Sequence, residues 1–238
     1  AQGQDLAWDA DVAIIGSGAG GAVAAEALSA AGLDVLILEE GGFYSSSDFR
    51  MLEAKAYPEL YQESAGRQTA DKAISILQGR SVGGGTTVNW TSSFRTPPDT
   101  LRWWQERYGL ASLTPEAMRP WFEKAEARLG IAPWDGQPNG NNLVLERGCQ
   151  ALGLRHARIR RNVRGCWNLG YCGMGCPTNA KQSMLVTCIP QALEHGARLL
   201  SRARVDRLQA NQSSSRIVQV HGSLLAADGV LATGRRFV

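Results

Sequence analysis

The chain has 238 residues, of which 44% are hydrophobic and 20% charged, with 25 basic against 22 acidic side chains. A net charge of +3 that is scattered along the chain excludes a strongly basic nucleic-acid surface. No apolar run reaches the ~20 residues that a membrane-spanning helix needs. The five cysteines are an odd number, so the sequence does not predict a secreted disulfide framework. We expect a globular, cytoplasmic protein, with peripheral membrane association as the alternative.

The first forty residues predict a βαβ unit. A short apolar run at 11–15 is typical of a strand buried on both faces, and the alanine-rich segment 22–31 predicts a helix that Gly32 ends. A second apolar strand follows at 33–38. A crossover of this kind joins two parallel strands, so we expect an α/β fold built on a parallel sheet.

The turn between the first strand and the helix has three glycines at dinucleotide-binding spacing, Gly16, Gly18 and Gly21. The first glycine makes the tight turn, the second admits a pyrophosphate to the backbone, and the third lets the helix pack closely on the strand. Glu39 ends the second strand, where a carboxylate can accept hydrogen bonds from a ribose and would repel a 2′-phosphate. The motif therefore predicts a dinucleotide site other than one for NADP, and a glycine-rich loop that binds nothing is the alternative.

Beyond this unit the sequence predicts helices and then strands. The predicted helices cover 97–129, 143–152 and 183–195, and the predicted strands cover 205–208 and 217–220. Thr114 is expected to cap a helix that starts at Pro115, and Pro190 to interrupt the last helix. Segment 133–142 is expected to be a loop, and 211–215 a turn.

A second glycine-rich segment, residues 79–89, separates FAD from NAD as the expected dinucleotide. Its three consecutive glycines, Gly83 to Gly85, remove side chains at an entropic cost that only a ligand or tight packing would justify. A flavin is a large planar ring that has to lie alongside backbone, whereas a nicotinamide enzyme needs no second segment of this kind. The predicted cofactor is FAD.

Three stretches of the chain resemble the glucose–methanol–choline (GMC) oxidoreductases. They are GSGAGG with LILEEGG, then GRSVGGGTTVNW, and then GCWNLGYCGMGCPTNAK at 165–181. The third stretch resembles the branch that includes long-chain alcohol oxidases and related bacterial dehydrogenases. The resemblance runs from about residue 9 to residue 238. One departure is that Phe94 comes one position later after Asn89 than in the family's usual signature.

The resemblance implies a Rossmann-like FAD-binding fold of the FAD/NAD(P)-binding type, incomplete here, with part of a second, substrate-side region. The expected segments are a FAD-binding part with a flavin-covering segment at 1–134, a substrate-side cap at 135–197, and a truncated β-rich return to the FAD-binding domain at 198–238. The implied activity is that of an FAD-dependent alcohol oxidase or dehydrogenase, in which a hydride passes from a CH–OH group to flavin.

The resemblance also assigns cofactor contacts residue by residue. The first glycine motif and the acid at the end of the second strand would face the pyrophosphate and ribose, the second glycine segment would border the phosphate and flavin, and the return strand would offer backbone groups to the adenine. The predicted cofactor-binding residues are Gly16, Gly18, Ala19, Gly21, Glu39, Glu40, Arg80, Gly84, Gly85, Thr86, Asn89 and Val205.

The sequence assigns no catalytic residue. None of the three histidines, His156, His195 and His221, stands beside a glycine motif. In the family that the chain resembles, the catalytic histidine comes near the C-terminus, so we expect it, with the missing C-terminal half, past Val238 or on another chain. The expected partners are a small-molecule alcohol and an electron acceptor, and no nucleic acid.

The cysteines raise an alternative function. Cys166, Cys172 and Cys176 would hold an iron–sulfur cluster in an electron-transfer dehydrogenase subunit, and Cys176 followed by Pro177 resembles the last ligand of a ferredoxin cluster. The spacing C-x5-C-x3-C is not the tight ferredoxin run, and no histidine stands at zinc-ligand spacing. We therefore predict loop thiols and no metal site. An inactive FAD-binding fragment is a third interpretation.

Overall fold

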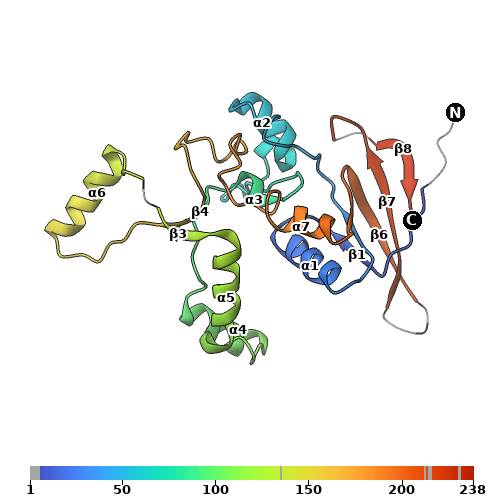
Figure 1. Ribbon diagram of the computed structural model, residues 1–238, viewed down its shortest axis with the longest axis horizontal. Helices are drawn as coiled ribbons and strands as arrows, with labels where there is room; N and C mark the ends of the chain where they lie inside the picture. Colours follow the sequence, from blue (N-terminus) through green and yellow to red (C-terminus); the bar gives the residue numbers. More distant parts are fainter. Residues whose placement is uncertain (1–5, 135, 212, 214–215, 230–231) are drawn as a thin grey trace. The chain divides into compact units, whose positions relative to one another are not determined.

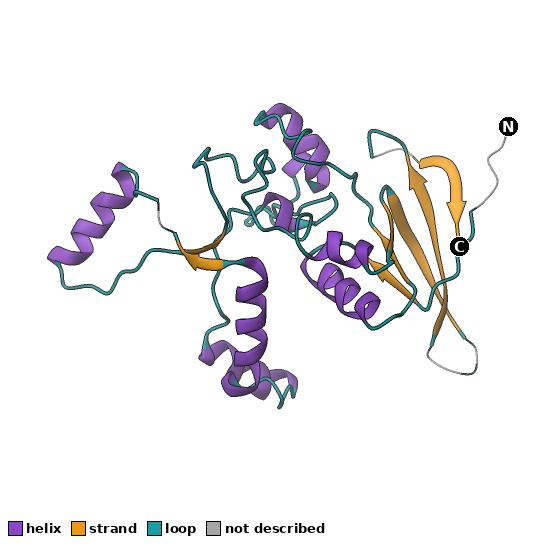
Figure 2. Ribbon diagram, viewed as in Figure 1, coloured by secondary structure: helices purple, strands orange, loops and turns teal. Residues whose placement is uncertain are grey.

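The computed structural model describes residues 6–134, 136–211, 213, 216–229 and 232–238 (Figures 1 and 2). By its internal contacts the chain divides into two units. We call residues 1–90 with 170–238 the glycine-motif unit and residues 91–169 the helical unit. The glycine-motif unit contains β1 (Val12–Ile15), α1 (Ala19–Ala30), β2 (Val35–Leu38), α2 (Glu53–Leu60), the 3-10 helix η1 (Gln62–Ala65), α3 (Gly85–Val88), α7 (Cys188–Glu194), β5 (Arg198–Leu200), β6 (Ala203–Ala210), β7 (Ile217–Leu225) and β8 (Ala232–Phe237). The helical unit contains α4 (Pro98–Tyr108), α5 (Pro115–Leu129), β3 (Ile131–Pro133), α6 (Gly140–Ala151) and β4 (Arg160–Asn162).

A parallel sheet in the order β1-β2-β5 forms the base of the glycine-motif unit. Val12 lies opposite Val35 across the first pair of strands, and Leu36 lies opposite Arg198 across the second. All four residues of the central strand β2 are buried, which explains why its sequence is apolar without alternation. Helix α1 connects β1 to β2 and lies beside α7 (Figure 1). The predicted βαβ unit and its parallel strands are confirmed.

An antiparallel sheet in the order β6-β7-β8 follows the parallel sheet and shares a core with it. Leu36 and Leu38 of β2 form a buried cluster with Ala203 of β6 and Phe237 of β8. The backbone also links the sheets, because the Ala203 N–H donates to the carbonyl of Glu39 at 2.8 Å. The residue that follows β2 is thereby joined to the first residue of β6, and this junction fixes where Glu39 lies.

The helical unit has little buried side-chain surface in its two longest helices. Neither α5 nor α6 has a buried residue. Thr114 caps α5 as predicted, because its Oγ1 accepts from the Ala117 N–H at 3.1 Å. Strands β3 and β4 pair antiparallel just after α5. Helix capping, the short β3–β4 strand pair and ion pairs therefore stabilise this unit.

Several predicted boundaries differ from the structure. Helix α1 begins at Ala19 rather than at residue 22, because Gly18 acts as its N-cap and the following glycines join the first turn. Helix α7 is shorter than the predicted 183–195, and Pro190 is its third residue, where proline removes no intrahelical hydrogen bond. The predicted loop at 133–142 is narrower, since Asn139 caps α6 by accepting from the Asn142 N–H at 3.0 Å.

Two further expectations stand apart from these corrections. Residues 212, 214 and 215 of the predicted turn at 211–215 lie outside the described residues. The unit boundaries fall after residues 90 and 169, whereas the predicted segments meet after 134 and 197. The predicted segments separate the part that faces the flavin from the part that faces the substrate. The packing of the two units does not test that division, so the segments stay a prediction. In the part of the chain that the structure describes, no helix is long and apolar enough to pass through a bilayer.

Candidate cofactor-binding site

The first glycine motif forms the turn from β1 into α1. The Gly16 N–H continues the sheet by donating to the Leu38 carbonyl at 2.8 Å, and Gly16 itself has a φ of +90°, which favours glycine. A Cβ atom on Gly21 would lie 1.9 Å from the Gly16 carbonyl oxygen, so only glycine fits there. The glycine requirement at these two positions follows from the turn, as the motif predicts.

The start of α1 presents free backbone donors. Its N-cap, Gly18, has no side chain to accept a hydrogen bond, and the first helical bond is the Ala22 N–H to the Gly18 carbonyl at 2.9 Å. The N–H groups of Ala19 to Gly21 therefore have no acceptor within the helix. Together with the helix dipole, they favour an anion such as a pyrophosphate.

Glu39 is buried and accepts three hydrogen bonds. Its Oε2 accepts from the backbone N–H and the hydroxyl of Ser17, at 2.9 and 2.6 Å, and its Oε1 accepts from the Gly41 N–H at 2.8 Å. Only 6% of the Glu39 residue is exposed to solvent, so these hydrogen bonds hold the carboxylate in one position. A carboxylate has about four acceptor positions, so one remains for a ribose hydroxyl.

Ser17 connects the two glycine segments. Its hydroxyl donates to Glu39 and accepts from the Gly83 N–H at 3.0 Å, and the residue is fully buried. Gly83 lies 66 residues further along the chain, inside the second glycine segment. One hydroxyl thus joins the first motif, the acid and the second segment, which the sequence predicts separately, into one buried network. We name this network the Ser17 relay.

The backbones of the two glycine segments also touch directly. A Cβ atom on Gly84 would lie 2.9 Å from the Cα of Gly18, and Gly84 has a φ of +55°. A side chain at this position would separate the two segments or strain the backbone. Nearby, the Ser81 hydroxyl is buried, 1% of the residue being exposed, and no hydrogen-bond partner for it is found among the described residues. The backbone N–H groups at the start of α1, the close approach of the Gly18 and Gly84 backbones and the buried Ser81 hydroxyl all fit a phosphate-containing ligand.

Arg80 and Glu40 form an ion pair rather than standing as separate ligand groups. The Arg80 Nε donates to Glu40 Oε1 at 3.0 Å, and the guanidinium also donates to the Gly229 carbonyl. Gln62 donates weakly to the other carboxylate oxygen of Glu40, at 3.4 Å. The structure thus brings these two predicted residues together, and their role toward the cofactor stays a prediction.

The other predicted residues have varied surroundings. Thr86 donates to the Gly83 carbonyl at 2.6 Å and accepts from the Met184 N–H at 2.9 Å, so its hydroxyl is used within the protein. Gly85, the first residue of α3, is exposed and has open space where a Cβ would be. Asn89 follows α3 and is exposed, while Val205 packs against the core cluster shared by the two sheets. Their cofactor contacts stay predictions.

A loop at residues 172–181 packs against the end of the second glycine segment. The Tyr61 hydroxyl donates to the Gly173 carbonyl at 2.6 Å and to the Val88 carbonyl at 3.4 Å. Burial raises the pKa of Tyr61 to about 12, so it remains a protonated donor at neutral pH. Tyr61 therefore connects α3 to this loop, a contact that no sequence pattern predicts.

The cysteines are all free thiols in the structure. Burial alone would raise the pKa of Cys176, but hydrogen bonds from the Thr178 hydroxyl and from backbone N–H groups, Lys181 among them, lower it below the usual thiol value. Cys166 belongs to the helical unit, and Cys172 and Cys176 to the glycine-motif unit. Within the described ranges, no group of three or more His, Cys, Asp or Glu side chains could hold a metal ion. The iron–sulfur alternative and the predicted absence of a metal site both stay predictions.

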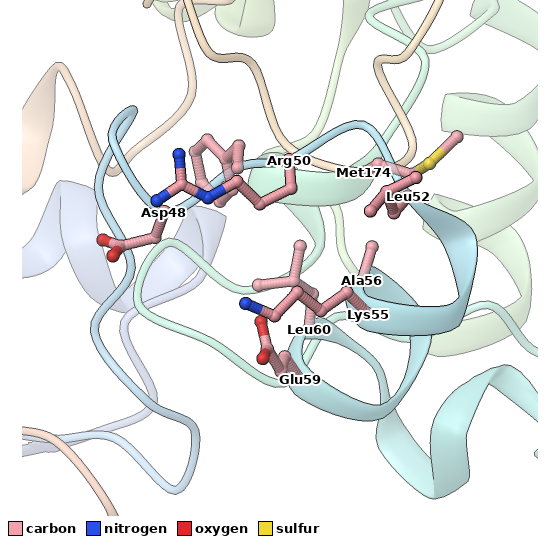
Figure 3. Close-up of a pocket in the computed structure, with 9 residues that line it drawn as sticks. Asp48, Arg50, Leu52, Lys55, Ala56, Glu59, Leu60 and Met174 are labelled. Carbon is pink, nitrogen blue, oxygen red and sulfur yellow. The ribbon is translucent and has the colours of Figure 1, made fainter.

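A small, open pocket lies beside α2 (Figure 3). Acidic and basic side chains of this region line it together with apolar ones. The lining residues are Asp48, Phe49, Arg50, Leu52, Lys55, Ala56, Glu59, Leu60 and Met174. None of the predicted cofactor-binding residues is among them.

The two histidines of the glycine-motif unit, His195 and His221, each contact a nearby glutamine. His195 is the C-cap of α7, where its N–H donates to the Gln191 carbonyl at 3.0 Å. His221 lies on β7 with its Nε2 3.2 Å from the Gln209 side chain. Neither shows a hydrogen bond to a glycine segment among the described contacts. No proton acceptor for catalysis is assigned.

Sequence reasoning missed the residues that join the predicted parts. Ser17 stands at a variable position of the glycine motif. Lys181 stands in the loop at 172–181, and its Nζ donates to the carbonyls of Thr87 and Asn89 in the second glycine segment. Neither residue has a diagnostic spacing in the sequence. The nearest signal was the GCPTNAK stretch, which resembles family members but does not say what its lysine contacts.

Comparison with known proteins identifies the family. A family model described as GMC oxidoreductase matches residues 57–232, more than half of the chain, and a model described as an NAD(P)-binding Rossmann-like domain matches residues 14–46. An uncharacterised GMC-type oxidoreductase of Sinorhizobium fredii is 36% identical over 217 residues, covering 90% of this chain and 43% of that protein. A long-chain-alcohol oxidase of Arabidopsis thaliana is also 36% identical, over 86% of this chain and 28% of that protein.

Solved structures agree on the fold. A formate oxidase of Aspergillus oryzae RIB40 matches with a TM-score of 0.62 at 14% identity, over 99% of this chain and 44% of that one. A pyridoxine 4-oxidase from Mesorbium loti matches with a TM-score of 0.62 at 17% identity, over 92% and 46%. The chain thus spans less than half the length of these proteins. The predicted Rossmann-like α/β fold is confirmed, and the family supports the predicted FAD cofactor. The chain belongs to the GMC oxidoreductase family.

Proposed function

We propose that this chain provides the FAD-binding site of an oxidoreductase that removes a hydride from the CH–OH group of an alcohol. The observation on which the proposal depends is the Ser17 relay, in which one buried hydroxyl of the first glycine motif bonds both to Glu39, which follows β2, and to Gly83 of the second glycine segment. Two bare backbone segments that are held together in this way suit a ligand with a pyrophosphate and a large planar ring.

Each part of the site has a distinct task in this proposal. The free N–H groups at the start of α1 would hold the pyrophosphate, and the remaining acceptor position of Glu39 would hold the ribose. The segment from Gly84 to Asn89 would border the flavin. When bound, FAD supplies the hydride acceptor, and the protein supplies binding and orientation. Fixed donors need no reorganisation when the cofactor binds.

The substrate assignment depends on relatives. Long-chain-alcohol oxidases of Arabidopsis thaliana are 30–36% identical to this chain over 84–86% of its length in three cases. We propose a small-molecule alcohol as the substrate and an electron acceptor, oxygen or another, as the partner that reoxidises the cofactor. The proposal gives this chain the cofactor site and leaves the proton acceptor and the rest of the substrate pocket to the C-terminal half expected from the family.

The test uses the native protein that contains this sequence. We expect it to purify with flavin absorbance, and we expect that absorbance to bleach without oxygen when a primary or secondary alcohol is added. The corresponding alkane and carboxylic acid are the controls and should cause no bleaching. Flavin that dithionite reduces but no alcohol does would contradict the proposed activity. A colourless protein that takes up no added FAD would contradict the cofactor site itself.

A further inference from the structure

Lys181 is a buried lysine whose ammonium group lies among backbone carbonyls. The residue is 2% exposed. Its Nζ donates to the carbonyls of Thr87 at 2.6 Å and Asn89 at 3.0 Å, and to the carbonyl of Cys172 at 2.7 Å. An ammonium group has three N–H donors, so these three bonds use all of them. A charge in such a position is tolerated because its donors are satisfied.

Two of the carbonyls that Lys181 contacts, those of Thr87 and Asn89, belong to the end of the second glycine segment, and the third, that of Cys172, belongs to the loop at 172–181. Helix α3 is a single turn, and its last carbonyls have no acceptor role within the helix. A cation at a helix C-terminus satisfies such carbonyls and is favoured by the local dipoles. Lys181 therefore fixes where this short turn ends and where Asn89 leaves it.

A second contact joins the same two segments. The Tyr61 hydroxyl bonds to the Val88 and Gly173 carbonyls, next to the Thr87, Asn89 and Cys172 carbonyls that Lys181 holds. Two buried donors from separate parts of the chain thus clamp residues 87–89 to residues 172–173. A stretch of backbone that served only as a connection would not require two such donors, since each costs desolvation.

We propose that Lys181 is a positioning residue for the flavin, which holds residues 87–89 at a fixed distance from the bound ring. The inference rests on the proposed function, because the flavin is expected to border this segment. It predicts that Lys181 acts on the flavin end of the cofactor and not on the adenosine end, which the Ser17 relay and the start of α1 would bind.

Lys181→Met tests this assignment in the purified native protein that contains this sequence, with FAD and ADP as separate ligands. Both ligands share the phosphate and adenosine groups, and only FAD has the flavin. We expect the affinity for FAD to fall about tenfold or more, which is the effect of losing charged hydrogen bonds, while the affinity for ADP stays within about twofold. The circular dichroism of bound flavin should also change, since it reports how the ring is held.

Two further variants control the experiment. Lys124→Met, at an exposed position of α5 in the helical unit, should leave both affinities unchanged. Lys181→Arg keeps the charge, but its planar fork does not match three converging carbonyls, so FAD affinity should fall at least about threefold with ADP affinity unchanged. This variant provides the same test if Lys181→Met does not fold.

Equal losses for FAD and ADP, or no loss for either, would overturn the assignment and leave Lys181 as a general stabilising residue. A wild-type native protein that binds ADP but not FAD would instead contradict the proposed function, and the positioning role with it. The two failures are distinguishable because the first appears only in the variants and the second already appears in the wild-type chain.

Discussion

Polar side chains stabilise each of the two units from within, but their surroundings differ between the units. In the glycine-motif unit the connecting side chains are buried, with Ser17 at 0% and Lys181 at 2% exposure. In the helical unit, Glu126 pairs with Arg95 and Arg160, both at 2.8 Å, and the two arginine side chains are 40% and 41% exposed. Water can replace the contacts of the second kind but not of the first. Substitutions in the site should therefore cost far more stability than substitutions in the helical unit.

The largest expected difference in the free energy of unfolding is between variants of two adjacent glutamates, Glu39 and Glu40. Glu39→Gln replaces a carboxylate that accepts three buried hydrogen bonds by an amide whose NH₂ faces donors, so we expect the free energy of unfolding to fall by about 3 kcal/mol. Glu40→Gln weakens a partly exposed pair with Arg80, and we expect a loss of about 1 kcal/mol or less. Urea unfolding followed by circular dichroism measures both. Equal losses would mean that the Ser17 relay does not stabilise the unit.

Two adjacent glycines sharpen the comparison within the second glycine segment. Gly84→Ala puts a Cβ 2.9 Å from the Gly18 Cα at a φ of +55°, so we expect a loss of about 2 kcal/mol, and weaker FAD binding. Gly85→Ala is the matched control, since nothing lies within 4 Å of its Cβ position and it starts α3. We expect a change of about 0.5 kcal/mol or less in this variant. If both variants behave alike in urea, the close approach of the two segments is wrong.

The smallest effect should appear in the helical unit at acid pH. Hydrogen bonds from Arg95 and then from Arg160 lower the pKa of Glu126 to about 2, against desolvation that raises it. Because the folded pKa is depressed, the stabilisation is complete above the ordinary value near 4.5 and is lost as the pH falls from there toward 2. After allowance for screening of the exposed arginines, we expect about 1 kcal/mol.

Glu126→Gln should remove this pH dependence, and added salt should reduce it in the wild-type chain. Urea unfolding at pH 5 and pH 3, at low and high salt, provides the measurement. A slope that persists in the variant, or that is insensitive to salt, would assign it to other carboxylates.

The sequence predicted the parts of the site better than the contacts between them. The run at 11–15, the glycines at 16, 18 and 21 and the acid at 39 are close in the chain and follow a fixed geometry, so local pattern was sufficient. Ser17 contacts Gly83 across 66 residues, and Lys181 contacts Thr87 across 94. No periodicity encodes such separations, because they depend on how the whole unit folds.

The helical unit also shows that local sequence pattern predicts elements better than it predicts their packing. Its helices were predicted from proline, threonine and apolar spacing, and Thr114 and Asn139 cap them. Nothing in that local pattern tells which elements pack together, so the boundary after Trp90 was not foreseen.

Hydrogen exchange of the chain with and without FAD tests most directly that both glycine segments bind one cofactor. We predict slower exchange of backbone amides in residues 16–21 and in residues 79–89 together, with both effects saturating at one FAD per chain. Protection of only one segment, or of neither, would contradict the account.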